Sequence, residues 1–295
     1  MPELPEVEVI RRGLAPRVAG RLFLDVVVGD KPLRRQSPPA ELQRWLIGRR
    51  IVRLERRGKH LLFHLEGGPT LLIHLGMTGR LLLLPASASG FSLTENRKPK
   101  TENGINPPPS PALPHVHLQF RLDGGLILAF QDARRFGQVE VFPPGEVPAQ
   151  LAQVGREPFS RSVTAQWLAS QAEGRSRPIK NFLLDGRILA GIGNIYASEI
   201  LFACGLHPGA PAGRLDETAW GQVLTETRRI LREAIRQGGT SVSDYLNSRG
   251  EAGLFQLQLK VYGRAGEGCE RCGAVIARLV QAGRSSFFCP ACQKM

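Results

Sequence analysis

Four cysteines near the C-terminus constrain the fold of this chain more than any other feature of its sequence. Cys269 and Cys272 form one C-x2-C pair, Cys289 and Cys292 form a second, and sixteen residues separate the two pairs. Two such pairs can bind one zinc ion through four thiolates, as in a structural zinc ribbon. A unit of roughly 35 residues buries too little apolar surface to fold alone, so the metal must supply folding energy. We therefore predict one structural Zn²⁺ with no open position for catalysis.

The alternative for these cysteines is a pair of disulfides, which requires an oxidising compartment. The first residues, MPELPEVEVIRRG, are acidic and then basic, and they lack the apolar segment of a secretory signal. The sequence also contains no apolar run of the length that predicts a membrane helix. We therefore expect a cytoplasmic protein without membrane association, whose thiols are reduced and whose paired cysteines bind zinc.

The charge of the chain indicates its kind of partner. It has 39 Lys and Arg residues against 26 Asp and Glu residues, and this net charge of +13 favours a polyanion, most often nucleic acid. Residues 1–84 contain 15 basic and 8 acidic residues, and the last 37 contain 6 and 2. The densest run, RRIVRLERRGK at 49–59, could alone be a solvated surface strand. Basic excess near both ends favours one shared anion-binding surface.

Periodicity divides the chain into a β-rich and a helical part. Residues 4–19 have apolar side chains at helical spacing, and seven short β-type runs follow between 21 and 142, which indicates a sandwich or barrel. Residues 85–114 contain seven prolines and are predicted to be a mobile loop inserted in this part. Beyond it, helices are predicted near 148–155, 164–173, 178–184, 193–204 and 216–237. The fold class is therefore α+β and multidomain.

The N-terminus allows two interpretations. Pro and Glu in MPELPE favour the first turn of a helix. If the initiator Met1 is removed, however, Pro2 becomes a free secondary amine that titrates near pH 8 and can form an iminium with an aldehyde-level carbon. Glu3 and Glu6 would then be placed for proton transfer. The residues alone do not rank this interpretation above the first.

Eight segments together resemble the bacterial formamidopyrimidine-DNA glycosylases, a family of base-excision repair enzymes. In the family's order, they are MPELPEVE at 1–8, RRGKHLLF at 56–63, HLGMTG at 74–79, QDARRFG at 131–137, IKNFLLD at 179–185, GIGNIYASEILF at 191–202, VYGR at 261–264 and the four-cysteine ribbon. Each is weakly specific alone, but the whole set is highly specific. Leu4 stands where the sister endonuclease VIII type usually has Gly, which favours the branch that removes oxidised purines.

The resemblance implies three domains and an activity. The domains are an N-terminal catalytic β-sandwich with an N-terminal helix at 1–147, a helical helix–two-turn–helix DNA-binding domain at 148–258 and a zinc finger at 259–295. The implied activity is that of a monomeric, bifunctional DNA glycosylase/AP lyase acting on double-stranded DNA with oxidised bases or abasic sites. It flips out and excises 8-oxoguanine and formamidopyrimidines and then nicks the strand by β,δ-elimination.

The resemblance also implies residue roles. Pro2 is the expected nucleophile at the sugar C1′ carbon, Glu3 its acid–base partner and Glu6 a supporting carboxylate. Lys59 and Arg284 are the expected proton donors for β- and δ-elimination, with phosphate contact alone as the alternative. The expected DNA contacts are His74, Met77, His115, Arg134, Phe136, Lys180, Asn194 and Arg264.

Two groups among these contacts have a physical reason for their role. Met77, Arg134 and Phe136 match the residues that fill the gap left by the flipped base, where apolar side chains replace stacking and arginine bonds the orphaned base. The alternative for Met77 and Phe136 is an ordinary core position. Asn194 and nearby backbone N–H groups at a helix start are expected to hold a phosphate.

Two alternative functions stay open. The same scaffold could prefer oxidised pyrimidines, because Ser243 stands where relatives often carry a basic residue in the loop that meets the flipped base. The chain could instead be a non-catalytic protein that binds damaged DNA. Retention of Met1 would favour the second alternative, since a blocked Pro2 cannot form the iminium.

Overall fold

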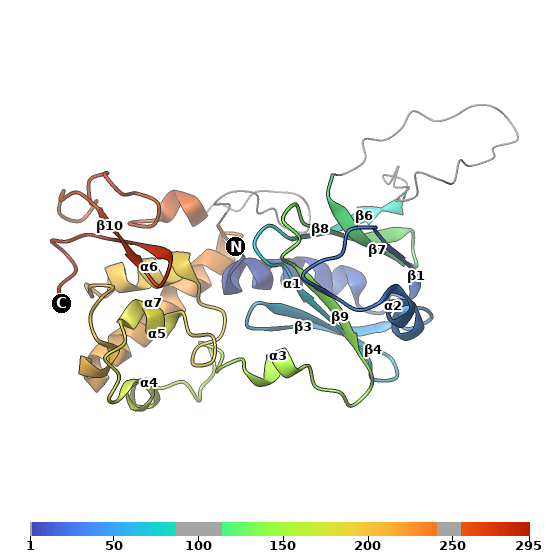
Figure 1. Ribbon diagram of the computed structural model, residues 1–295, viewed down its shortest axis with the longest axis horizontal. Coiled ribbons are helices and arrows are strands. Elements are labelled where there is room, and N and C mark those ends of the chain that lie inside the picture. The colour runs from blue at the N-terminus through green and yellow to red at the C-terminus, as the bar shows by residue number, and fades with distance from the viewer. Residues whose placement is uncertain (1, 87–113, 241–254) are drawn as a thin grey trace, which may run out of the picture.

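The computed structural model describes residues 2–86, 114–240 and 255–295 (Figure 1). The expectations for Met1, for residues 87–113 of the proline-rich insertion and for Ser243 therefore lie outside the described residues. Figure 1 shows the β-rich N-terminal part at one end of the molecule, and the helices of residues 165–236 with the cysteine-bearing hairpin at the other. Among the described residues, no helix has the length and apolarity needed to cross a bilayer.

Two sheets form the N-terminal part. One has the order β1 (Phe23–Val28), β7 (Val116–Leu122), β8 (Leu126–Gln131), β6 (Arg80–Pro85), and all its pairs are antiparallel. The other has the order β2 (Arg35–Gln36), β9 (Gln138–Phe142), β5 (Thr70–His74), β4 (His60–Leu65), β3 (Ile51–Arg57), and only β2 and β9 pair in parallel. One continuous core takes side chains from both sheets, including Phe63 of β4 and Phe120 of β7. This is the β-sandwich expected from the alternating runs.

Helix α1 (Leu4–Val18) joins this sandwich to the helical part. The predicted apolar face packs into the sandwich core through four fully buried side chains, Val7, Ile10, Leu14 and Val18. Leu4, one turn earlier, packs instead into the core of the helical part. The first turn of α1 therefore lies where the two parts meet, and a short helix α2 (Pro39–Leu46) covers the sandwich elsewhere.

The helical part contains α3 (Ala149–Ala152), α4 (Ala165–Ala172), α5 (Ile179–Leu183), α6 (Asn194–Ala203), the short 3-10 helix η2 (Ala212–Arg214) and α7 (Glu217–Arg236). The Asp216 side chain caps α7 by accepting a bond from the N–H of Ala219 at 2.8 Å, as the sequence predicts for this helix start. The fully buried Trp220 of α7 packs on Phe182 of α5 with ring centroids 5.0 Å apart. Residues 184–193 connect α5 to α6 through turns, which gives the helix–turn–helix arrangement its geometry.

The C-terminal part is a small hairpin unit. It contains β10 (Ala277–Gln281) and β11 (Arg284–Phe288), which pair antiparallel. The 3-10 helix η3 (Phe255–Gln258) precedes it and packs through Phe255 into the core of the helical part. The apolar cluster of the hairpin unit contains Val261 and Ile276 together with two cysteines, and Phe202 of α6 completes it. A core this small agrees with the expectation that metal supplies folding energy.

The helices predicted from periodicity are confirmed to within a few residues, but the β part differs in two places. Residues 70–85, TLLIHLGMTGRLLLLP, count in the sequence as one of the seven β-type runs, but they form two strands, β5 and β6, which belong to different sheets. Strand β2 and helix α2 were not predicted from the sequence. In α2 only Leu42 and Leu46 are buried, so its eight residues have too little periodicity to be recognised.

Candidate active site and zinc centre

Glu3 lies in a buried part of the molecule, directly after the buried Pro2. Its side chain is 2% exposed, and its carboxylate accepts bonds from the N–H groups of Gly193 at 2.7 Å, Ile195 at 3.0 Å and Tyr196 at 3.4 Å. These groups form the N-terminus of α6, where a carboxylate is favoured. A Cβ atom on Gly193 would overlap the Glu3 carboxyl group, so glycine at this position lets Glu3 lie where it does.

This contact corrects one expectation for the start of α6. The backbone N–H groups near Asn194 were expected to hold a phosphate, but they hold the Glu3 carboxylate instead. The Asn194 amide donates to the Ser285 carbonyl at 2.9 Å. A helix N-terminus binds whichever anion the fold presents to it, and here the anion belongs to the chain itself.

Glu6 is the second buried carboxylate of the site. It accepts bonds from the N–H of Glu3 at 2.8 Å and the Tyr196 hydroxyl at 2.6 Å. The N–H of Thr240 donates to it at 2.9 Å, and the hydroxyl of the same residue at 3.1 Å. Glu6 therefore ties the first turn of α1 to α6 and to the end of α7. Tyr196 and Thr240 were not predicted as site residues, although Tyr196 lies inside the GIGNIY motif.

Lys59 brings a cation to these carboxylates from the turn between β3 and β4. Its Nζ donates to the Ile192 carbonyl at 3.2 Å. Burial lowers the pKa of Lys59, although Glu3 opposes the shift, and Arg284 lowers it further. Burial likewise raises the pKa of Glu3, although Lys59 opposes that shift. The site thus holds an acid and an ammonium group whose pKa values move toward each other, as proton transfer near neutral pH requires.

Lys180 lies deeper than a phosphate-contacting lysine was expected to lie. It is 1% exposed, and its Nζ donates to the Ser285 carbonyl at 2.8 Å and to the Ser286 hydroxyl at 2.7 Å. Burial, with repulsion from Arg284, lowers the pKa of Lys180 to about 8. Lys180 and Asn194 therefore hold the β10–β11 hairpin against α5 and α6, and the adjacent Arg284 is left exposed.

Met77, Arg134 and Phe136 gather in two loops of the sandwich, between β5 and β6 and between β8 and β9. Met77 is 40% exposed and Phe136 41%, so the alternative that they are core residues is wrong. The Arg134 guanidinium lies over the Phe136 ring, 4.9 Å from its centroid. Both loops border an open groove of about 590 Å³. The sequence alone would have assigned these apolar side chains to the core, and only the motif resemblance indicated otherwise.

The remaining predicted contacts have mixed surroundings. His74 borders the same groove, and its Nδ1 accepts a bond from the N–H of Gly76 at 3.0 Å. Burial lowers the pKa of His74 to about 3, so it is a neutral ring at physiological pH. His115 is exposed. Arg264 forms ion pairs with Glu267 at 2.8 Å and Glu270 at 2.6 Å, so its charge is already engaged within the cysteine-bearing unit.

The four cysteines come together as their spacing predicts. The Sγ atoms of Cys269, Cys272, Cys289 and Cys292 all lie within 4.8 Å of one another, and the thiols are free. Four sulfurs bound to one zinc at about 2.3 Å stand roughly 3.8 Å apart, so this cluster fits a tetrahedral ion. The N–H of Cys292 points at the Cys289 sulfur at 3.4 Å, which stabilises a thiolate at that position. The donor set fits a structural zinc ion and leaves no position for substrate.

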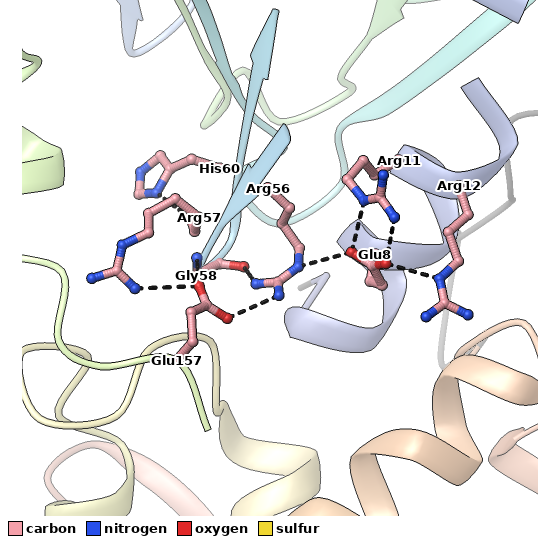
Figure 2. A network of polar contacts seen from close by, with 8 residues as sticks. All are labelled: Glu8, Arg11, Arg12, Arg56, Arg57, Gly58, His60 and Glu157. Atoms are coloured by element: carbon pink, nitrogen blue, oxygen red, sulfur yellow. Dashed lines mark hydrogen bonds and ion pairs between the residues drawn. The ribbon is translucent and has the colours of Figure 1, made fainter. Parts of the chain in front are cut away.

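An ion-pair network fastens the Lys59 turn to the connection between the two main parts (Figure 2). Arg56 lies between two carboxylates and donates to Glu8 at 3.1 Å and to Glu157 at 2.8 Å. Glu157 also accepts the N–H of Gly58 at 2.6 Å. Hydrogen bonds from Arg11 and Arg12 lower the pKa of Glu8 to about 2, although its burial opposes the shift. Nothing in the sequence marked Glu157, because its partners lie about a hundred residues away.

Replacing Arg56 by methionine should lower the free energy of unfolding by on the order of 3 kcal/mol, since it leaves Glu8 and Glu157 without their shared cation. The side chain of Arg56 is 10% exposed, so solvent screens the pair poorly. Urea denaturation at pH 7 measures the change. The control is Arg53→Met, whose pair with Glu55 is exposed and should contribute about 0–1 kcal/mol. Equal losses in the two variants would contradict a stabilising role for the network.

Comparison with known proteins matches each of the three parts to a family model. Residues 1–139 match the Formamidopyrimidine-DNA glycosylase N-terminal domain, 154–245 the Formamidopyrimidine-DNA glycosylase H2TH domain, and 266–294 the Zinc finger found in FPG and IleRS. The chain is 43% identical to the formamidopyrimidine-DNA glycosylase of Cereibacter sphaeroides, over 100% of both chains.

Solved structures agree with this result. The MutM (Fpg) protein of Thermus thermophilus is 38% identical, with a TM-score of 0.82 over 99% of this chain and 98% of the other. Lactococcus lactis Fpg bound to DNA with an abasic site is 31% identical, with a TM-score of 0.83 over 99% and 100%. Other complexes of the Lactococcus protein contain Fapy-dG DNA or oxidised-pyrimidine DNA. This chain therefore belongs to the formamidopyrimidine-DNA glycosylase family.

Proposed function

We propose that this protein is a bifunctional DNA glycosylase/AP lyase that excises oxidised purines from double-stranded DNA in base-excision repair. The observation that carries the proposal is the buried Glu3 carboxylate, which directly follows Pro2 and is coupled to the Lys59 ammonium group. Family membership and the net charge of +13 support DNA as the partner. We further propose that it acts as a cytoplasmic monomer.

In the proposed reaction, removal of Met1 frees the Pro2 amine. The Pro2 nitrogen forms a bond to C1′ of the damaged nucleotide, the N-glycosidic bond breaks, and the base leaves with the bonding electrons and a proton. Glu3 protonates the sugar ring oxygen as the ring opens, which converts the adduct to an iminium. The raised pKa of Glu3 suits this step, because a larger fraction of the carboxyl group is protonated at neutral pH.

Strand cleavage follows from the iminium. Loss of the C2′ proton expels the 3′-phosphate with the electrons of its bond, and Lys59 supplies the proton to the departing group. The lowered pKa of Lys59 makes its ammonium a better acid than an ordinary lysine. Arg284 lies exposed on the hairpin, near Lys180 of α5, and serves the second elimination. In that step, loss of the C4′ proton expels the 5′-phosphate with the electrons of its C5′–O bond.

The DNA-contacting surface combines the exposed side chains on both sides of this site. Met77, Arg134 and Phe136 occupy the gap that the flipped nucleotide leaves, because exposed apolar side chains replace lost base stacking. His74 and His115 face the backbone near this gap, with Arg264 at the cysteine-bearing unit. Lys180 and Asn194 act through the hairpin they hold, in addition to any phosphate they reach.

Borohydride trapping tests the proposal. Wild-type protein and duplex DNA with 8-oxoguanine opposite cytosine should form a covalent adduct that peptide mass mapping places on Pro2, with Met1 absent. A protein with an N-terminal extension that keeps Pro2 inside the chain is the control and should bind DNA without trapping. Trapping only on oxidised-pyrimidine or abasic DNA would show that the substrate is not an oxidised purine, and it would leave the Pro2 mechanism in place. Tight binding without any trap would support the non-catalytic alternative.

A further inference from the structure

The Asp132 carboxylate is a buried group that the proposed chemistry does not use. It is 0% exposed and lies directly after β8, at the start of the loop that leads to β9. One oxygen accepts bonds from the Thr78 hydroxyl at 2.5 Å and the N–H of Arg134 at 3.2 Å. The other accepts the N–H of Gly137 at 2.8 Å. A buried carboxylate is costly unless it is hydrogen-bonded, so these bonds stabilise the loop in this shape.

The partners of Asp132 belong to two different loops. Thr78 lies between β5 and β6, directly after Met77, whereas Arg134 and Gly137 lie between β8 and β9 and bracket Phe136. The bond to Thr78 therefore links the loop that carries Met77 to the loop that carries Phe136. A further weak contact joins the same loops, from the N–H of Arg134 to the Thr78 hydroxyl at 3.3 Å.

The two loops also touch through their backbones. Gly76 has a φ of +62°, and a Cβ atom there would lie 2.5 Å from the Phe136 carbonyl carbon. Glycine therefore permits both the left-handed conformation and the close approach. This contact and the Asp132 bonds set the spacing of Met77 and Phe136, whose side chains are both exposed.

We propose that Asp132 is a positioning residue that joins these two loops into one rigid wedge for insertion into the DNA duplex. The inference rests on the proposed function, because it takes Met77, Arg134 and Phe136 as the gap-filling residues. A wedge must enter the base stack at the moment when the lesion leaves it. Loops that moved independently would lose conformational entropy on insertion, so a preformed link between them lowers the cost of flipping.

Two variants separate the link from folding. Asp132→Asn keeps the side-chain size but turns an N–H₂ group toward one of the present donors, so it breaks at least one bond. Thr78→Val keeps the shape and removes the two contacts that the Thr78 hydroxyl makes between the loops. The matched control is Thr70→Val, which removes a hydroxyl contact to His64 elsewhere in the sandwich. Thermal unfolding shows whether each variant folds, and Thr78→Val keeps the test valid if Asp132→Asn does not.

The experiment measures insertion of the wedge directly. The fluorescent base 2-aminopurine is placed next to an 8-oxoguanine that is paired with cytosine, and its fluorescence reports the change in stacking. In both variants we expect the rate of the 2-aminopurine fluorescence change and the rate of single-turnover base release to fall about 10- to 100-fold. The Kd for DNA should change less. The defect should shrink on DNA whose lesion is unpaired, because flipping then costs less. A generally weakened fold would not produce that rescue.

The outcomes distinguish this inference from the proposed function. If wild-type protein releases base and both folded variants match it in rate and fluorescence signal, the positioning role is wrong and the function stands. An equal defect on paired and unpaired lesions would also overturn the positioning role. If wild-type protein neither releases the base nor forms a borohydride-trapped adduct, the proposed function itself is wrong.

Discussion

Replacing Glu3 with glutamine should lower single-turnover base release by roughly 10²–10⁴-fold, the usual contribution of a general acid–base group. Glutamine is nearly the same size, so it occupies the same pocket at the start of α6, but it cannot give a proton to the sugar ring oxygen. DNA affinity should change little, because Glu3 is only 2% exposed. Base release from 8-oxoguanine duplex and binding by fluorescence anisotropy measure the two effects separately.

The control for this variant is Glu41→Gln, which removes an exposed carboxylate from α2, away from the site. Cleavage of a preformed abasic site should be less affected in Glu3→Gln than base release, because the aldehyde there is already available to Pro2. Base release at the wild-type rate would remove Glu3 from the mechanism. Equal loss in base release and in DNA binding would indicate a structural defect rather than lost proton transfer.

Removing zinc should have the second large effect. Structural zinc binding contributes about 10–16 kcal/mol in small metal-folded units, far more than the small core of this one can supply. Loss of the metal should therefore unfold the β10–β11 hairpin and free Lys180 and Asn194 from the Ser285 carbonyl. DNA affinity should fall steeply, and any residual cleavage should stop after β-elimination because Arg284 is displaced.

Cys289→Ala or exhaustive chelation produces the metal-free protein, and metal analysis must verify it. Cys204→Ala is the matched control, since Cys204 is a free cysteine outside the four-sulfur cluster. Titration with fluorescent abasic-site DNA gives the affinity of each form. Wild-type affinity in verified metal-free protein would show that the ribbon does not hold the DNA-binding surface.

The features whose geometry depends on residues close in the sequence could be predicted from the sequence alone. The C-x2-C spacing determined the four-sulfur cluster, because two tight turns bring each pair together locally. The spacing of apolar residues determined α1 and α7, because one face of each helix had to be buried. The resemblance in motifs identified the family, and the comparisons confirmed it.

The site geometry could not be predicted because it depends on contacts between distant residues. The Glu3 carboxylate takes the helix N-terminus that appeared free for a phosphate, across 190 residues of sequence. Lys180 is turned into the protein by a hairpin about a hundred residues later, and Glu157 meets the Lys59 turn from a similar distance. Sequence pattern determined which elements form, because periodicity and spacing are local properties. Only the tertiary structure decided which anion meets which donor, because a buried charge takes the partner that the packing of whole elements brings within hydrogen-bond distance.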